Sequence, residues 1–304
     1  MRPQVVAILC GDIHLSLSPP LARAKEKDWL EAQARPLKQL RKLKREYDVP
    51  ILCAGDIFDR WNSPPELINW ALDNVPKMYT IPGQHDLPTH NYGLMHKSAY
   101  WTMAMAANKD KGIHDLEPNE NHLLRGIHLE AFPWGHSLTP PQSSKKGQLK
   151  VALVHQYVWI IGATYPGAPM DAMLRGGMKE MKGWDVIVFG DNHKGFLTTK
   201  GKTTIFNCGG FQRRKSDEIG SKPQVGLLYD DGSVKAYLLD TSKDVIEETS
   251  TALEVHEDMG LEEFLEELTK LQESQLDFEE AMRQLLRERK PGTLVCKLIL
   301  EAMK

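Results

Sequence analysis

Five short apolar runs, each followed by polar residues, constrain the fold of this chain most strongly. Each is five or six residues long and rich in β-branched residues, and they lie at residues 5–10, 49–54, 77–82, 151–156 and 186–190. Such runs are typical of strands that are covered on both faces, with helices between them. The sequence therefore predicts an α/β fold built on layered sheets.

The segments around these runs complete the expected element order. Residues 26–47 are charged and carry Leu at helical spacing, and Pro36 is expected to break them into two helices. Ser63, Pro64 and Glu66 form a helix-start signature with Ser63 as the N-cap. Further strands are expected at residues 127–134, 202–207, 224–230 and 234–240. The turn "DDGS" joins the last two as a hairpin.

The character of the chain changes near residue 258, where amphipathic helical patterns begin. We expect a main domain over residues 1–215, a small β extension over residues 216–257 and a helical tail over residues 258–304. The tail either docks on a partner helix or packs back on its own domain, since helices of this length need tertiary contacts to be stable.

Composition narrows the class of protein. The 304 residues carry a net charge of -3, with 38 basic and 41 acidic side chains. This balance argues against a passive nucleic-acid binder, because non-specific affinity for phosphates comes from positive charge. Four separated cysteines indicate no disulfide framework, and no apolar segment approaches the length of a membrane span. We expect a soluble, cytoplasmic protein with no membrane association.

Side chains able to bind metal follow all five runs. The eight candidate donors are Asp12, His14, Asp56, Gln84, His85, His155, Asp191 and His193, whereas Asp59 is interpreted as a helix or turn cap. Ligands collect where the strands of an α/β sheet end, so these groups are expected to share one edge. Oxygen and imidazole donors without thiolate favour Mg²⁺, Mn²⁺ or Fe, and their number suits two ions that share a carboxylate. Each piece alone has an ordinary alternative as a turn former, a cap or a hydrogen-bonded core histidine. The ordered set favours the metal site.

Taken in order, the motifs "GDIH", "GDIFD", "GQHD", "VHQ" and "GDNH" resemble those of calcineurin-like metallophosphoesterases over residues 5–215. The resemblance implies a layered β-sandwich flanked by helices, with two divalent metal ions. The implied ligands of the first ion are Asp12, His14, Asp56 and His193, with Asp56 bridging. Those of the second are completed by Gln84, His155 and Asp191. His85 is the implied catalytic histidine, oriented by Asp86 through a hydrogen bond.

The second metal site departs from the family pattern at two positions. Gln84 stands where the family has Asn, and Asp191 stands where it has His. Gln offers the same amide oxygen on a longer arm, and Asp exchanges a neutral imidazole for an anion. Both can bind metal, and the exchange at position 191 favours a harder ion such as Mn²⁺ or Mg²⁺.

Two longer stretches are similar to DNA-repair nucleases of the SbcD type. They are "GDIFDRWNSPPELINWAL" and "FNCGGFQRRKSDEIGSKPQVGLLYDDGSVKAYLLD". The similarity implies a two-metal DNA phosphodiesterase, with Mn²⁺ as the expected metal and Mg²⁺ or Fe as alternatives. It also implies a homodimer and an SbcC-type ATPase partner that binds the helical tail.

Candidate substrate contacts surround the expected site. They are the basic residues Arg213, Arg214 and Lys215, together with Tyr157 and His90. The alternatives are a solvated loop for the basic residues and packing under the sheet for the aromatic loop 156–184, which also holds Trp159 and Tyr165. Alternative functions are hydrolysis of small nucleotides or phosphoproteins, and a metal-binding scaffold whose altered second site has lost catalysis.

Overall fold

The computed structural model describes residues 3–109, 111–118, 120–142, 145–165, 167–174 and 179–247. The chain divides into two units, Met1–Thr164 with Asp171–Thr249, and Tyr165–Met170 with Ser250–Lys304. All the strands and α-helices given below belong to the first unit. The helical tail expected over residues 258–304 lies outside the described residues.

Two six-stranded sheets form the body of this unit. The first has the order β12-β11-β1-β2-β3-β4, and the second the order β5-β6-β7-β8-β10-β9. The strands of the first sheet are β1 (Val5–Cys10), β2 (Ile51–Cys53), β3 (Tyr79–Thr80), β4 (His114–Asp115), β11 (Gln224–Tyr229) and β12 (Val234–Leu238). Those of the second are β5 (Asn121–Leu124), β6 (Ile127–Phe132), β7 (Leu149–His155), β8 (Val186–Gly190), β9 (Phe196–Lys200) and β10 (Thr203–Asn207).

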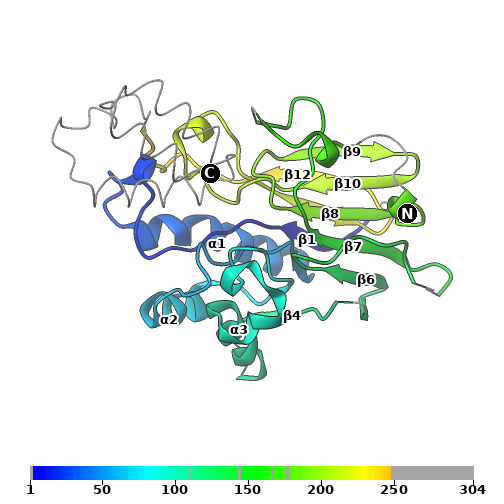
Figure 1. Ribbon diagram of the computed structural model, residues 1–304, viewed down its shortest axis with the longest axis horizontal. Coiled ribbons are helices and arrows are strands. Elements are labelled where there is room, and N and C mark those ends of the chain that lie inside the picture. The colour runs from blue at the N-terminus through cyan, green and yellow to red at the C-terminus, as the bar shows by residue number, and fades with distance from the viewer. Residues whose placement is uncertain are drawn as a thin grey trace, which may run out of the picture. The chain divides into compact units, whose positions relative to one another are not determined.

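Helices flank the sheets. The α-helices are α1 (Trp29–Tyr47), α2 (Pro65–Asn74) and α3 (Ala99–Met105), which Figure 1 shows together beside the first sheet. Short 3₁₀ turns are η1 (Leu21–Arg23), η2 (Pro88–His90), η3 (Tyr92–Lys97), η4 (Ala106–Lys109), η5 (Met170–Ala172), η6 (Lys179–Met181) and η7 (Ser216–Glu218). The predicted α/β sandwich flanked by helices is confirmed.

Strand alternation builds three apolar layers. Ile8 and Cys10 of β1 pack with the helices, whereas Ala7 and Leu9 turn to the opposite face. That inner face meets apolar side chains of β6, β7, β8 and β10, so the two sheets share one core. A third cluster covers the outer face of the second sheet and includes Trp184. Because apolar interiors are close-packed, this shared core fixes the relative position of the two sheets.

The helix α1 differs from the prediction, because Pro36 lies inside one continuous helix rather than between two. Pro36 removes one backbone hydrogen bond, but Leu37, Leu40 and Leu43 are all buried against the first sheet and hold the helix together. The Asp28 side chain caps the N-terminus by accepting from the backbone N–H of Glu31 at 2.9 Å. Packing of the apolar face therefore outweighs the cost of the proline.

Other expectations were met in part. The nine expected strands are present, and β11 and β12 form the expected hairpin. The short strands β4, β5 and β9 were not expected. Ser63 does not cap α2, because the N-cap is Pro64 and the Ser63 hydroxyl donates to the carbonyl of Arg60. The strands assigned to a separate β extension belong to the first sheet, since β11 pairs with β1.

Three arginines and two carboxylates gather where the chain leaves β12. Arg23, which is 1% exposed, lies 2.5 Å from Glu26 and 3.2 Å from Asp244. Arg35 lies 2.7 Å from Glu26, and Arg213 lies 3.2 Å from Asp244. Because Glu26 is shared by two guanidinium groups and Asp244 by three, the cluster pairs charges that would be costly to bury alone.

The described cysteines Cys10, Cys53 and Cys208 are free and buried, as expected for small apolar core residues. Cys296 lies outside the described residues. Among the described helices, none is long and apolar enough to cross a membrane.

Replacing Pro36 by Ala is expected to stabilise the protein by about 2 kcal/mol, because the missing helical hydrogen bond is restored at the expense of some unfolded-chain entropy. Urea denaturation of the two proteins measures the difference. Pro65→Ala is the matched control, since Pro65 occupies the first turn of α2, where a backbone N–H has no helical partner. A loss of stability in Pro36→Ala would contradict the prediction.

Candidate metal centre

The candidate ligands lie at the carboxyl ends of strands from both sheets. Those from the first sheet are Asp12 and His14 after β1, Asp56 after β2, and Gln84 and His85 after β3. Those from the second are His155 at the end of β7, with Asp191 and His193 after β8. Parallel pairing of β1 with β2 and of β7 with β8 brings these ends together within each sheet. The shared core then brings the two sets together.

The backbone at the centre is held in an unusual conformation. Eight non-glycine residues in the described part of the chain have positive φ. Four of them are candidate ligands: Asp12 at 52°, His14 at 48°, Asp56 at 53° and Asp191 at 81°. Left-handed conformations cost energy for residues with a Cβ and concentrate at functional sites. The strand ends are therefore bent to aim these side chains inward.

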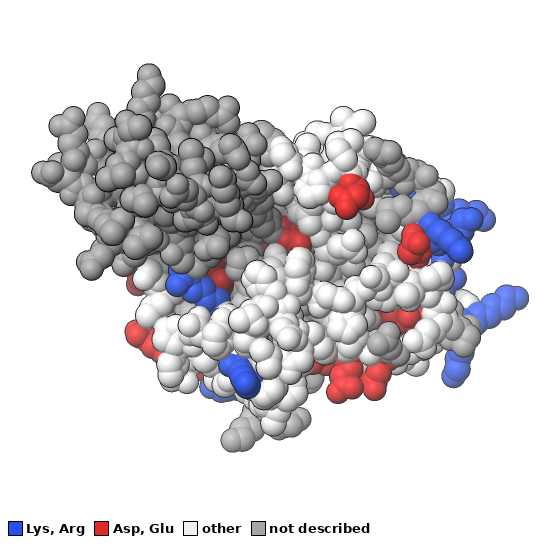
Figure 2. Space-filling model, in the orientation of Figure 1, with Lys and Arg blue, Asp and Glu red and all other residues white. Residues whose placement is uncertain are grey.

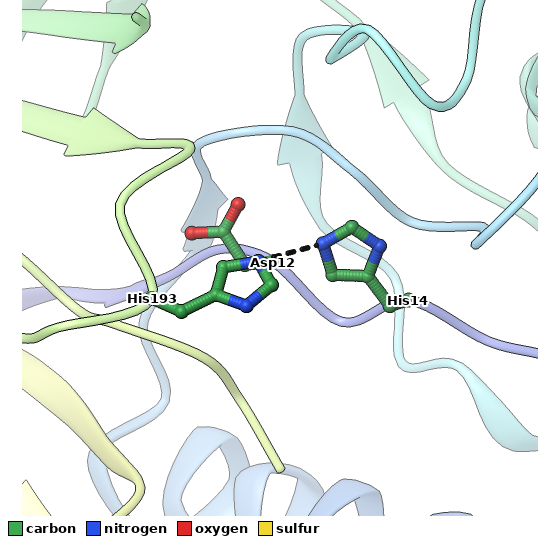
Figure 3. A group of neighbouring side chains, drawn as sticks. All are labelled: Asp12, His14 and His193. Atoms are coloured by element: carbon green, nitrogen blue, oxygen red, sulfur yellow. Dashed lines mark hydrogen bonds between the residues drawn. The ribbon is translucent and has the colours of Figure 1, made fainter. Parts of the chain in front are cut away.

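The first cluster consists of Asp12, His14 and His193 (Figure 3). The Nε2 atoms of His14 and His193 are 3.0 Å apart, and Asp12 lies beside them. The Nδ1 atom of His14 lies 3.5 Å from Asp59, and that of His193 lies 3.6 Å from Glu218. Each ring thus has a carboxylate on its outer side, which favours a proton on Nδ1 and a lone pair on Nε2.

The second cluster is centred on Asp56, which is fully buried. The Nε2 atom of His155 lies 3.5 Å from Asp56 Oδ2 and 2.6 Å from Gln84 Oε1. The amide nitrogen of Gln84 donates to Asp191 at 2.7 Å, and the backbone N–H of Asp191 donates to Asp12 at 2.9 Å. The longer arm of Gln84 therefore spans His155 and Asp191, the other altered position.

Unpaired polar atoms show that this donor set fits divalent metal ions. Asp12 Oδ2 and Asp56 Oδ2 are buried and accept no hydrogen bond. His155 Nδ1 lies 2.5 Å from the carbonyl oxygen of Ala54, which can only accept, so Nδ1 carries the proton. The Nε2 atom of the same ring faces two acceptors, Gln84 Oε1 and Asp56 Oδ2. Burial opposes a charge on this ring, but Asp56 raises the pKa of His155, which favours a second proton on Nε2. A divalent cation would take the place of that proton and would also pair the buried carboxylate oxygens.

Electrostatics favour a cation at the same place. Burial alone raises the pKa of Asp56, but His155 and His85 hold that pKa below its usual range. Burial lowers the pKa of His14 to about 3, so its ring stays neutral and able to coordinate. Burial raises the pKa of Asp12 to about 6 despite the opposing effect of His193. The centre therefore combines buried carboxylates with imidazole nitrogens, of which those of His14 belong to a neutral ring.

Three glycines surround Asp56 and His155 at close range. A Cβ on Gly83 would lie 2.0 Å from Asp56 Oδ1 and 2.6 Å from His155 Cε1. A Cβ on Gly55 or Gly190 would lie 2.3 or 2.9 Å, respectively, from His155 Nδ1. Separations below 3.0 Å force a displacement. Glycine is required here because the ligands occupy the space that a side chain would fill.

Of the two predicted catalytic residues, His85 lies beside the first cluster, whereas Asp86 has other partners than expected. His85 is half-buried beside His14, with ring centroids 4.7 Å apart, and its Nδ1 lies 2.9 Å from the carbonyl oxygen of Asp59. Asp86 was expected to orient His85. Instead its carboxylate accepts the backbone N–H groups of Ile57, Phe58 and Gly83 at 3.0 to 3.2 Å. Asp86 thus ties the turn after β2 to the turn after β3.

The three basic residues expected to contact the substrate have different surroundings in the structure. Arg214 lies at the centre, with Nη1 2.7 Å from the His14 carbonyl oxygen and 2.6 Å from Asp59 Oδ1. Arg213 points to Asp244 instead, so its assignment as a substrate contact is corrected. The backbone N–H of Lys215 donates to Glu218 at 3.0 Å, which places this residue on the same loop as Arg214.

The other candidates for substrate contact differ in how far they are buried. Tyr157 is half-buried two residues beyond His155, whereas Trp159 is 7% exposed and packs inside, which excludes it as an open stacking surface. His90 is exposed on the turn that follows His85.

Sequence reasoning missed two carboxylates that support the histidines. Asp59 was taken as a cap, yet it forms a candidate cluster with His14 and His85. Glu218 lies beside His193 although it is far from the metal motifs in sequence. The only available signal for Asp59 was its place in "GDIFD", and Glu218 had none.

A family model described as calcineurin-like phosphoesterase matches residues 6–195. The chain belongs to this family. It is a metal-dependent phosphoesterase, and the clusters described above supply the candidate ligands for its metal ions. No curated protein sequence matches the chain significantly.

Several solved structures are similar to this chain at low sequence identity. An archaeal phosphodiesterase is 10% identical, with a TM-score of 0.39, over 77% of this chain and 99% of its own. The phosphoesterase YfcE from E. coli is 14% identical, with a TM-score of 0.34, over 77% of this chain and 99% of its own. A putative 5'-nucleotidase from Staphylococcus aureus is 12% identical, with a TM-score of 0.42, over 83% of this chain and 56% of its own.

Gly83→Ala is expected to weaken Mn²⁺ binding at least tenfold, because the new methyl group displaces Asp56 or His155. Isothermal titration of the metal-free protein measures the affinity. Gly220→Ala is the matched control, since a Cβ there meets nothing within 4 Å. Equal affinity of Gly83→Ala and the wild type would show that these ligands do not hold the ion.

Glu218→Gln is expected to weaken metal binding by about 10- to 100-fold, because the neutral amide no longer supports the proton on His193 Nδ1. The amide oxygen can still accept the backbone N–H groups of Arg214 and Lys215, so the loop is expected to stay folded. Asp217→Asn serves as the control, because Asp217 is exposed and paired only with Lys194 among the described residues. The same loss in both variants would point to general charge rather than to the His193 contact.

Proposed function

We propose that the chain is a two-metal phosphodiesterase that cleaves DNA, similar to SbcD-type nucleases. The observation that carries the proposal is the position of Arg214. Its guanidinium group reaches the metal centre from a loop that, in sequence, resembles the Arg-containing loop of those nucleases. Among the described residues only Nη1 of this group has partners, which leaves other N–H donors for a backbone phosphate.

The charge distribution is compatible with a substrate held at the site rather than on a broad basic surface. On the face shown in Figure 2, Lys and Arg lie toward the margins, and most of the middle carries no charge. The net charge of -3 is also unfavourable for binding phosphates over a broad surface. Metal ions and Arg214 would therefore supply most of the attraction for phosphate at the point of cleavage.

The ligand set supports the binding of two ions. Asp12, His14 and His193 would hold one, while Gln84, His155 and Asp191 would hold the other, with Asp56 between them. When bound, such ions activate water and neutralise the charge that develops on phosphorus oxygens. The oxygen-rich second set favours Mn²⁺, with Mg²⁺ or Fe as alternatives.

His85 is suited to donate a proton to the leaving oxygen. The carbonyl oxygen of Asp59 can only accept, so Nδ1 of His85 carries a proton and donates it in that hydrogen bond. Transfer must therefore take place at Nε2, from the doubly protonated ring. Asp59 has two roles, because its carbonyl holds His85 while its carboxylate lies beside His14 and Arg214.

The proposal also includes two protein partners. We infer that an SbcC-type ATPase binds the segment 258–304 and that the nuclease domain pairs with a second copy, as in the nucleases that the sequence resembles.

The proposed activity is tested with end-labelled duplex and single-stranded DNA incubated with the purified full chain and Mn²⁺ or Mg²⁺. Wild type is expected to cleave the DNA, while Asp56→Ala and His85→Ala lower the rate by about 100-fold or more. Asp48→Ala is the control, because Asp48 is an exposed carboxylate at the end of α1.

The outcomes separate the alternatives. Cleavage of a small nucleotide ester with DNA left intact would replace DNA by a small nucleotide as substrate. Absence of both activities, together with loss of the second ion, would identify a metal-binding scaffold.

A further inference from the structure

Two aromatic pairs line up beside the metal centre. His90 meets Trp134 edge to face, with ring centroids 6.3 Å apart, and Tyr92 meets His136 in the same manner at 4.8 Å. The partners are two residues apart on each segment, so the turn after β3 and the segment after β6 run alongside each other. The backbone N–H of Trp134 donates to the carbonyl of Pro82 at 3.2 Å and fixes this alignment. We call these four side chains the aromatic ledge.

The ledge starts at a candidate metal ligand. The ring centroid of Trp134 lies 6.4 Å from that of His155, whose Nε2 faces Asp56 and Gln84. Trp134 is half-buried and His90 is exposed, so the ledge leads from the centre toward solvent. Trp134 therefore lies within reach of a group attached to a phosphate at the centre.

Packing does not explain the ledge. Among the described residues, the three apolar clusters contain neither Trp134 nor Tyr92. In an edge-to-face pair one ring presents its edge and keeps both of its faces clear of the other ring. The His90–Trp134 pair, with an interplanar angle of 78°, therefore has ring surface left for a third planar group.

The backbone that presents His90 is strained. Thr89 and His90 have φ angles of 48° and 55°, although neither is a glycine and Thr89 is β-branched. Both are exposed, so burial of their side chains does not compensate for the strain. Strain of this kind persists where a position serves binding or catalysis. The turn thus holds His90 over Trp134 at an energetic cost.

We propose that the aromatic ledge stacks on the nucleobase next to the scissile phosphate, with Trp134 as the main platform and His90 beside it. The inference rests on the proposed phosphodiesterase function and names the chemical class that the enzyme recognises beyond the phosphate. Aromatic stacking accepts any base, because every base has a π-face. The ledge would therefore select nucleotides over other phosphodiesters without reading sequence.

The test compares two esters with the same leaving group, thymidine 5'-(4-nitrophenyl phosphate) and methyl 4-nitrophenyl phosphate, in the presence of Mn²⁺. Wild type is expected to prefer the thymidine ester in kcat/KM by about tenfold or more. Trp134→Ala should remove this preference mainly through a higher KM, and Trp134→Phe should keep part of it. Trp101→Ala, which changes a half-buried tryptophan on α3, should leave the preference unchanged. An unchanged preference in Trp134→Ala would overturn the proposal.

A second measurement does not depend on activity. The metal-free full chain is titrated with oligothymidylate, and Trp134→Ala is expected to bind about tenfold more weakly than wild type. Equal affinities, or no binding by wild type, would overturn the ledge as a base platform. If wild type hydrolyses the esters with the expected preference but leaves DNA intact, the DNA substrate fails while the ledge stands. If it cleaves DNA and Trp134→Ala changes neither preference nor binding, the ledge alone fails.

Discussion

The orientation of the histidine rings is the constraint on which the metal centre depends. Nδ1 of His155 and of His85 faces a backbone carbonyl, while Nδ1 of His14 and of His193 faces a carboxylate. Because an acceptor on the outer side keeps the proton there, the inner Nε2 atoms of the candidate ligands are free to coordinate. The acceptors come from the turn after β2 and from the loop after β10. Both segments must therefore be in place before the rings can point inward.

The two-sheet core makes this possible. The first sheet supplies Asp12, His14 and Asp56, and the second supplies His155 and His193, so neither sheet forms the centre alone. The apolar layer between the sheets fixes their separation, and Asp86 then fastens two neighbouring turns through three backbone N–H groups. Burial and the nearby charge of Asp56 raise the pKa of Asp86 to about 7, which reflects how deeply this brace is enclosed.

The main strands and the positions of the candidate ligands could be predicted from sequence, because apolar runs that end in Gly-Asp or Gly-Gln-His mark strand ends directly. Contacts between distant segments could not. Glu218 meets His193 only because the loop after β10 returns to the turn that follows β8, and no local sequence pattern predicts that path. Arg213 and Arg214 are neighbours in sequence, but one joins a buried ionic cluster and the other reaches the centre.

The unexpected elements have similar physical causes. The strand β4 has two polar residues, and β9 is an edge strand with alternating exposed residues, so neither forms an apolar run. The continuity of α1 across Pro36 depends on tertiary packing that outweighs local propensity.

The glycines around Asp56 and His155 limit how such a centre can change during evolution. A Cβ at Gly55, Gly83 or Gly190 would collide with Asp56 or His155, so these three positions are closed to larger residues while the ligands stay in place. A change of metal preference then has to proceed by exchange of the ligand side chains themselves. Gln84 and Asp191, which hydrogen-bond to each other, have the form expected of two such exchanges made together. The three glycine positions are thus constrained, whereas the donor atoms that would bind the metal can differ.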